Sequence, residues 1–353
     1  MRFMKLLSVI FVSAVAALAQ EQAIDWNKAR DLHRRAQAGE KLSPEEQKYY
    51  DEARRQRAKG QAGPRADAPP KPPPNLVPLT ELKGEYHGET GGLYGGGKNE
   101  PPPSHATRAA RAVAEIKPLD RDGRPAADGK VVLMSIGMSN TTQEFSAFVQ
   151  KAAAAPQKAA HVTVVDAAQG GMDGDSWSKA DSRTWAVAEQ RLGASGVSPA
   201  QVQAVWIKQA LKGPRNGFPA ETERLRDRLR DIVGIAKQKY PNLRAVYFSS
   251  RIYAGNAKSA LNPEPYAYES AFAVRWLIEE QIKGGLKDAP VLLWGPYIWA
   301  NGETPNKDGG LSYAPGDFAA DGTHPGTPAR AKVAAALLDF FTTSPFAKPW
   351  FAK

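Results

Sequence analysis

From residue 130 onward, short apolar runs alternate with longer amphipathic stretches, and this alternation constrains the fold more than any other feature of the chain. Runs of this length between turn signals are typical of buried strands; they lie at 131–135, 162–166, 203–207, 245–249 and 291–294. Helical patterns occupy the stretches between and after them: 143–155, 182–192, 221–240, 266–283 and 328–341. This order predicts a three-layer α/β/α domain whose five-stranded parallel sheet is covered by helices on both faces.

The first 19 residues have the pattern of a secretory signal peptide. Arg2 and Lys5 precede an apolar run at 6–18, which ends in a small-x-small cleavage pattern at 17–19. A 13-residue run is too short to cross a bilayer comfortably. We therefore expect a secreted or periplasmic protein with no stable membrane span after cleavage, with an uncleaved anchor as the alternative.

Four further segments follow the signal peptide. Residues 20–60 carry helical patterns and a helix start at Ser43, and residues 61–79 are Pro-rich, as an extended linker is. Residues 80–129 contain a Gly/Pro-rich loop and a helix, which we expect to pack on the domain that follows. The α/β domain then covers 130–353.

Composition excludes several kinds of site and partner. The chain has no cysteine, which excludes disulfides, thiolate metal sites and cysteine nucleophiles and makes serine the natural candidate nucleophile. Lys and Arg (47) exceed Asp and Glu (37), for a net charge of +10, or about +8 without the two charges of the signal peptide. The basic residues are dispersed, and the densest run, at 221–230, alternates in sign, so we expect no nucleic-acid partner.

Two loops at predicted strand ends could supply a nucleophile and its base. In parallel α/β sheets the ligand site lies outside the carboxyl ends of the strands. Ser139 follows the first strand, where it could be a nucleophile or could simply cap the next helix. Asp321 and His324 lie three residues apart just before the last helix, so one turn could provide both the general base and the carboxylate that orients it.

Two other loops could stabilise the negative charge that develops on an attacked carbonyl oxygen. Gly170 and Gly171 follow the second strand, and paired glycines let a backbone amide approach a ligand closely. Gln209 ends the third strand, where it is either an amide donor or a surface residue. Asp173 and Asp175 lack the other ligands of a calcium loop, so we expect no metal.

In their order along the chain, these loops resemble the motifs of the SGNH (GDSL-like) hydrolase superfamily. The resemblance covers about residues 130–342 and is closest to the carbohydrate-esterase branch with sialate O-acetylesterases and acetylxylan esterases. The matching blocks read Gly137-Met138-Ser139-Asn140, then Gln169-Gly170-Gly171 with Trp177, and finally Asp321-Gly322-Thr323-His324-Pro325. The third block departs from the pattern: Trp206-Ile207-Lys208-Gln209-Ala210 shifts the glutamine by one position and lacks the acidic residue.

The resemblance implies an SGNH-type, flavodoxin-like fold and a two-step acyl transfer without a cofactor. Its catalytic residues would be Ser139, His324 and Asp321. The oxyanion hole would consist of the amides of Ser139 and Gly171 and the side chain of Gln209.

Substrate contacts in such a site would come from Asn140, Trp177, Lys208 and Arg251. Core packing of Trp177, and a buried salt bridge or a phosphate site at Arg251, remain alternatives. The expected substrate is a small or polymeric carbohydrate ester, most simply an acetate. A non-hydrolytic SGNH-fold saccharide-binding protein of the envelope and a lipase or thioesterase are the competing hypotheses.

Overall fold

The structure is a computed structural model that describes residues 24–25, 28–29, 32, 42–60 and 75–353. The chain divides into two units, Met1–Arg65 and Ala66–Lys353. The predicted signal peptide and most of the predicted linker lie outside the described residues. Among the residues described, no helix is long and apolar enough to cross a membrane.

In the first unit, helix α2 spans Pro44–Gly60. Its start is the predicted capping box, because the Ser43 hydroxyl accepts the Glu46 N–H at 3.2 Å and the Glu46 carboxylate accepts the Ser43 N–H at 2.9 Å. Of the other helix expected between 24 and 41, only a few residues are described.

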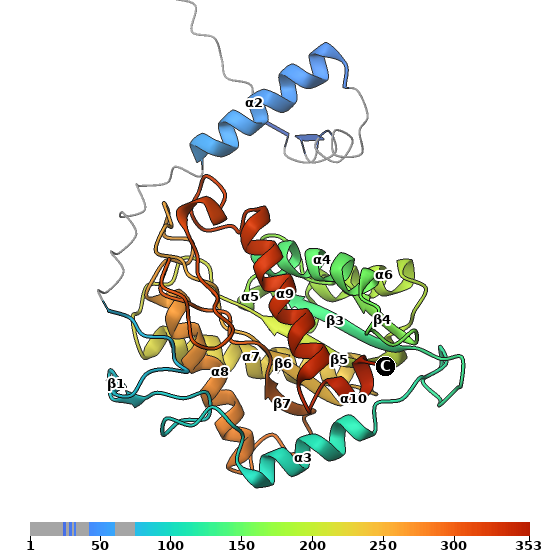
Figure 1. Ribbon diagram of the computed structural model, residues 1–353. Helices are drawn as coiled ribbons and strands as arrows, with labels where there is room; N and C mark the ends of the chain where they lie inside the picture. Colours follow the sequence, from blue (N-terminus) through green and yellow to red (C-terminus); the bar gives the residue numbers. More distant parts are fainter. Residues whose placement is uncertain (1–23, 26–27, 30–31, 33–41, 61–74) are drawn as a thin grey trace, which may run out of the picture. The chain divides into compact units, whose positions relative to one another are not determined.

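The centre of the second unit is a parallel five-stranded sheet in the order β4-β3-β5-β6-β7 (Figure 1). The strands are β3 Val131–Gly137, β4 Val162–Val165, β5 Val202–Lys208, β6 Ala245–Phe248 and β7 Val291–Trp294. Every residue of β3, β5, β6 and β7 is buried, which is why these strands read as mostly apolar runs. The five strands and the α/β class predicted from the sequence are confirmed.

Helices cover both faces of this sheet. One face packs against α3 Pro103–Ala114, α4 Ser139–Ala154, α9 Thr327–Thr343 and α10 Lys348–Phe351. The other packs against α5 Gly174–Trp177, α6 Arg183–Ala194, α7 Ala220–Lys239 and α8 Tyr266–Ile282. Successive strand residues alternate between these two cores, with Val131 and Leu133 in one and Val132 and Met134 in the other.

The Gly/Pro-rich loop is ordered and packs on the edge of the sheet that β7 forms. It contains a small hairpin of β1 Glu85–Tyr86 and β2 Glu89–Thr90. The Tyr86 ring packs against Phe272 of α8, and the indole N–H of Trp294 donates to Leu93 O at 2.8 Å. On α3, His105 is buried and its Nε2 lies 2.8 Å from Leu292 O.

Candidate active site

In parallel α/β sheets, the crevice at the carboxyl ends of the strands lies where neighbouring crossovers leave in opposite directions, and the strand order places such a point beside β3. The chain passes from β3 outward to β4 and then returns to the other side of β3 to form β5. The crossovers on the two sides of β3 therefore leave in opposite directions, and α/β proteins bind ligands at such a switch point. Ser139 follows β3 and Gln209 follows β5, so the two predicted site residues flank this crevice.

The turn after β3 requires glycine. A Cβ on Gly137 would collide with the carbonyl oxygen of Lys208 and the hydroxyl of Thr141. That hydroxyl donates to Lys208 O at 2.7 Å, which ties the first turn of α4 to the end of β5. The sharp turn brings Ser139 directly to the crevice.

Ser139 does not cap the helix. α4 begins at Ser139 itself, four residues before the start predicted from periodicity, because Met138 is the extended N-cap residue. The first turn leaves the N–H of Ser139 without an intrahelical acceptor. Its hydroxyl instead lies 2.8 Å from His324 Nε2. The alternative interpretation of this serine as a simple helix cap is therefore wrong.

A hydrogen-bonded chain runs from Ser139 through His324 to Asp321. His324 Nδ1 lies 2.5 Å from Asp321 Oδ2. An ionised carboxylate can only accept, so Nδ1 carries the proton, and Nε2 is free to accept from the Ser139 hydroxyl. The described structure thus brings together the three residues predicted for the triad, although 185 positions separate Ser139 from His324.

The other oxygen of the Asp321 carboxylate organises its own loop. Asp321 Oδ1 accepts the backbone N–H groups of Thr323 and His324, each at 2.9 Å. Burial raises the pKa of Asp321, but the backbone and side-chain hydrogen bonds of His324 outweigh it and hold that pKa below the ordinary 3.8. The carboxylate therefore stays ionised and fixes the imidazole tautomer.

Asn140 supports this loop from the helix that carries Ser139. Its side chain is 1% exposed, and its Nδ2 donates to Thr323 O at 2.9 Å. The substrate contact predicted for Asn140 does not fit this burial. The residue instead holds α4 against the loop of His324.

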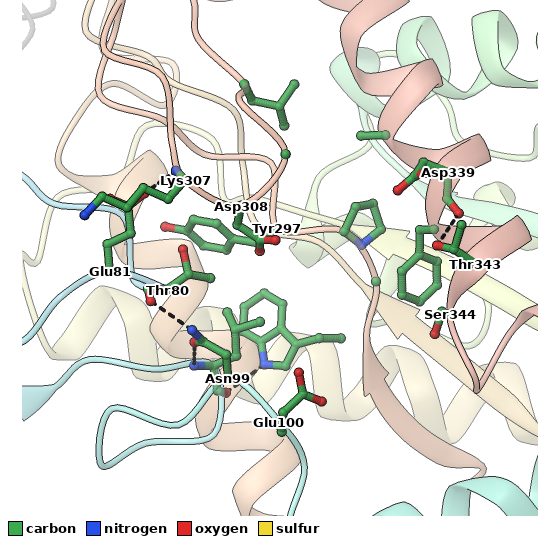
Figure 2. A pocket seen from close by; sticks show the side chains of 18 of the residues that line it. Thr80, Glu81, Asn99, Glu100, Tyr297, Lys307, Asp308, Asp339, Thr343 and Ser344 are labelled. Atoms are coloured by element: carbon green, nitrogen blue, oxygen red, sulfur yellow. Dashed lines mark hydrogen bonds between the residues drawn. The ribbon is translucent and has the colours of Figure 1, made fainter.

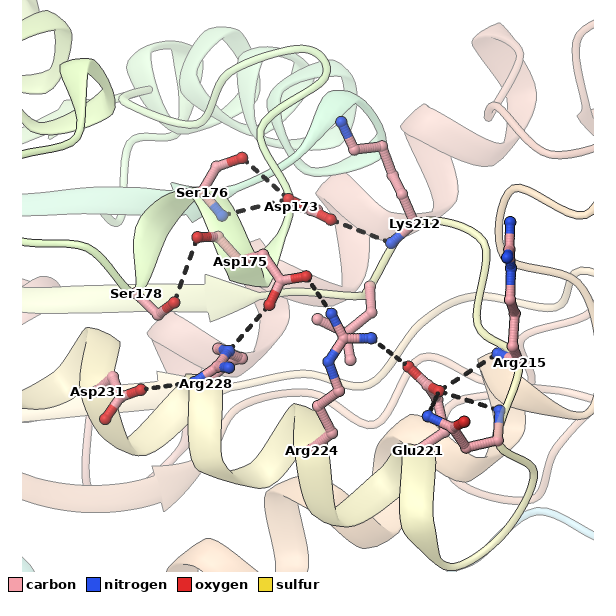
Figure 3. Close-up of polar contacts among 12 residues, drawn as sticks. Asp173, Asp175, Ser176, Ser178, Lys212, Arg215, Glu221, Arg224, Arg228 and Asp231 are labelled. Atoms are coloured by element: carbon pink, nitrogen blue, oxygen red, sulfur yellow. Dashed lines mark hydrogen bonds and ion pairs between the residues drawn. The ribbon is translucent and has the colours of Figure 1, made fainter. Parts of the chain in front are cut away.

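The other two donors predicted for the oxyanion hole, Gly171 and Gln209, lie on segments that hydrogen bonds join to each other. Gly171 adopts a positive φ of 77°, and Gln209 is buried with its Nε2 lacking a partner among the described residues. Lys212 Nζ donates to Gly171 O at 2.9 Å. The Lys212 N–H donates to the Asp173 carboxylate at 3.1 Å (Figure 3). The segment that follows β5 therefore holds the Gly171 loop in place.

The carboxylates of this region are occupied by protein donors. The second oxygen of Asp173 accepts from the N–H and hydroxyl of Ser176, at 3.2 and 2.9 Å, and caps α5. Asp175 bridges Arg224 and Arg228 of α7 (Figure 3). Within the part of the chain that the structure describes, no group of three or more His, Asp or Glu residues could hold a metal ion.

Lys208 forms a buried ion pair, whereas Arg251 is buried with its Nε and Nη2 lacking a partner among the described residues, so the salt bridge considered as an alternative at Arg251 is not seen there. Lys208 Nζ pairs with both carboxylate oxygens of Glu144, 2.5 Å from Oε1, and both side chains are 0% exposed. Burial lowers the pKa of Lys208 to about 8; Glu144 opposes this effect and Arg251 adds to it. Arg251 is 2% exposed, and burial lowers its pKa as well. Direct substrate contact does not fit either side chain as placed.

Trp177 is a core residue. It is 0% exposed, packs edge-on against Trp185, and donates its indole N–H to Gly137 O at 3.0 Å. A sugar cannot stack on a ring that is closed off from solvent. Through this hydrogen bond Trp177 supports the turn before Ser139. Its placement agrees with the alternative that it packs in the core.

Sequence reasoning missed Asp166 and Glu144. Asp166 ends the second predicted strand, and its carboxylate accepts from Ser135 at 2.6 Å, Thr142 at 2.5 Å and Ser146 at 2.8 Å, so it fixes the base of α4. The sequence did offer one signal for Asp166, an acidic residue at the end of a predicted strand. Glu144 lies inside an amphipathic helix, and nothing in the pattern distinguishes it from a solvated carboxylate.

Comparison with known proteins returned solved structures only. No protein-family model and no curated protein sequence matches the chain. A carbohydrate esterase family 3 structure from Talaromyces cellulolyticus is 11% identical, with a TM-score of 0.37, covering 58% of this chain and 93% of that one. A GDSL-like lipase from Bacteroides thetaiotaomicron is 10% identical, with a TM-score of 0.35, covering 67% and 95%. A lipopolysaccharide acetyltransferase periplasmic domain from Salmonella ser. Paratyphi A is 13% identical, with a TM-score of 0.36, covering 60% and 84%.

By their names, the matched structures include a carbohydrate esterase, a lipase and an acetyltransferase domain. At these identities and TM-scores, the chemistry of this chain has to be inferred from its own site.

Proposed function

We propose that the protein is an exported serine esterase that removes O-acyl groups, most simply acetyl, from a carbohydrate. The observation that carries the proposal is the chain from Ser139 Oγ to His324 Nε2 at 2.8 Å and from His324 Nδ1 to Asp321 at 2.5 Å. Nucleophile, base and orienting carboxylate in this arrangement are what serine-dependent acyl transfer requires.

In the first step, Ser139 Oγ attacks the ester carbonyl while His324 Nε2 takes the hydroxyl proton. The tetrahedral intermediate collapses to an acyl-enzyme as the ester C–O bond breaks, and His324 gives the proton to the departing sugar oxygen, which leaves as a hydroxyl. Water then attacks the acyl-enzyme with His324 again as the base, which releases the acid and restores the Ser139 hydroxyl.

Three donors can face the developing oxyanion. Two are backbone N–H groups, of Ser139 in the first turn of α4 and of Gly171. The third is Gln209 Nε2, which has no hydrogen-bond partner among the described residues but is itself buried, so it reaches an oxyanion only if the side chain rotates toward the site. Removing one such donor typically lowers the rate by about 10²–10³-fold. The shifted third block of the sequence is therefore compatible with turnover.

The carbohydrate part of the proposal rests on the motif resemblance, and export rests on the pattern of residues 1–19. A polar site also favours a short acyl group over a long one. Ester substrates of increasing acyl length test this choice. A rate that increases from acetate to octanoate would instead indicate a lipase or thioesterase.

The direct test is hydrolysis of p-nitrophenyl acetate and of acetylated glycans by the purified protein. We expect turnover that falls by at least about 10⁴-fold in Ser139→Ala, since triad residues act as a unit. Ser195→Ala is the matched control. Ser195 is exposed at the C-cap of α6, and its hydroxyl donates to Arg191 O of the same helix. Activity that survives Ser139→Ala would exclude the proposed mechanism. Saccharide binding without any turnover would identify the non-hydrolytic alternative.

A further inference from the structure

A large cleft of about 1,170 Å³ lies at the carboxyl end of the edge strand β7 (Figure 2). The Gly/Pro-rich loop forms one wall, the segment after β7 forms the floor, and one side of α9 forms the other wall. None of the residues proposed for catalysis or for the oxyanion hole lines it. The cleft is therefore separate from the candidate active site, although α9 follows directly after the His324 loop.

The floor of the cleft is built from aromatic side chains that are locked to the loop above them. The Trp294 indole N–H donates to Leu93 O at 2.8 Å, and the Tyr297 hydroxyl accepts the Leu79 N–H at 2.9 Å. The Asn99 amide donates to Thr80 O at 2.9 Å (Figure 2). The bonds of Trp294 and Tyr297 join segments about 200 residues apart in the chain, and together with the Asn99 bond they hold the wall and floor in a fixed shape. Binding to a preformed cleft loses less free energy to the ordering of loops and side chains than binding to a mobile surface does.

The charged groups around the cleft are mixed and largely unpaired. Four carboxylates and three ammonium groups line it, a net charge of −1. Among the described residues, the charged ends of Glu100, Asp308 and Lys307 have no hydrogen-bond or ion-pair partner, and all three residues are exposed. Although Asp308 is exposed as a residue, partial burial of its carboxyl group raises its pKa, and the nearby Glu100 and Glu81 raise it further, so these carboxylates border a common space.

We propose that this cleft is a second, non-catalytic site that binds a neutral saccharide chain. The idea rests on the proposed function, because the chain held here would be the polymeric ester that Ser139 deacylates. Free carboxylates accept hydrogen bonds from sugar hydroxyls, and free ammonium groups donate to them. The slight negative charge disfavours polyanions such as nucleic acid. A single small ligand typically fills about 300–1,000 Å³, so this volume suits an extended chain.

The test separates binding from turnover. In full-length Ser139→Ala, calorimetry would measure the affinity for two neutral hexasaccharides, xylohexaose and cellohexaose, with polygalacturonate as the anionic comparison. We expect at least one neutral hexasaccharide to bind more tightly than polygalacturonate. Adding Glu100→Ala and Asp308→Ala should weaken that binding about tenfold or more, while Glu223→Ala, an exposed carboxylate on α7, should leave it unchanged.

In the active protein, Glu100→Ala with Asp308→Ala should leave kcat on p-nitrophenyl acetate unchanged and raise KM severalfold on acetylated polymer. If the wild-type protein shows no turnover, the proposed function is wrong. The binding measurement on Ser139→Ala still tests the cleft in that case. The cleft proposal is wrong if neither hexasaccharide binds, or if the double variant binds the hexasaccharide as tightly as its parent.

Discussion

The side-chain amide of Asn140 donates to the main-chain carbonyl of Thr323 at 2.9 Å and is almost completely buried. This single bond joins the helix that carries the candidate nucleophile to the loop that carries its base. The distance between Ser139 and His324 therefore depends on a residue that cannot itself reach a substrate.

We expect Asn140→Ala to lower kcat by about 10–100-fold with little change in KM, because small displacements of catalytic groups are costly. Steady-state kinetics would measure both parameters. Asn242→Ala is the matched control: its amide also donates to a carbonyl, Ala200 O at 2.8 Å, but it lies just before the amino end of β6, whereas Ser139 follows the carboxyl end of β3. Each substitution should cost about 1 kcal/mol of stability. An increase in KM alone for Asn140→Ala would instead indicate substrate contact.

Replacing Asp321 with asparagine should lower kcat by about 10⁴-fold, because an amide permits the wrong imidazole tautomer. The structure should survive, since the Asn oxygen can still accept the N–H of Thr323 or His324. Kinetics and circular dichroism on the same sample would check the two expectations. Full activity in Asp321→Asn would remove Asp321 from the mechanism.

Asp321 should also contribute to stability in a pH-dependent manner. Its pKa in the folded protein lies below 3.8, because the hydrogen bonds of His324 and Thr323 outweigh the opposing effect of burial. The folded state thus binds this proton less readily than the unfolded state. The stabilisation is complete above about pH 4 and is lost as the pH falls through the folded-state pKa. Unfolding free energies measured from pH 6 to pH 2 should show a shallower acid decline in Asp321→Asn than in the parent.

Lys212 should act on the oxyanion through Gly171. Removing the bond from Lys212 Nζ to Gly171 O in Lys212→Met should lower kcat about tenfold, less than the loss of a whole oxyanion donor. Lys212→Arg should recover most of this loss. Lys237→Met is the control, since Lys237 Nζ donates to Pro241 O at 2.7 Å away from the site. Equal effects of Lys212→Met and Lys237→Met on kcat would show that the positioning role is wrong.

The buried pair of Glu144 and Lys208 should have a large effect on stability where α4 packs against β5. Glu144→Gln leaves an ammonium group buried without a counter-charge, which typically costs about 3–5 kcal/mol. Replacing both residues with methionine should return most of that stability, because both desolvation penalties disappear. Urea unfolding would measure these differences. Glu280→Gln, which breaks a half-exposed pair with Arg230, should change stability by at most about 1 kcal/mol.

Much of the fold follows from local patterns. The runs at 245–249 and 291–294 agree with β6 and β7 to within a residue, because a strand buried on both faces must be apolar along its length. Boundaries were less accurate where tertiary contacts decide them. α4 starts at Ser139 because the Gly137 turn and the hydrogen bond from Thr141 to Lys208 O allow it. The helical periodicity of the sequence does not mark this start.

The sequence by itself determined which chemistry-bearing residues end which strands: a serine after β3, a glutamine after β5, and an Asp-x-x-His before the last helix. It also excluded a cysteine nucleophile. Only the tertiary structure decided which side chains face the crevice and which are buried. Trp177, Lys208 and Arg251 occupy positions near the motifs, yet each is closed off from solvent. The reason is physical: the strand order sets which loops meet, but rotamers and packing across elements far apart in the chain set where each side chain points.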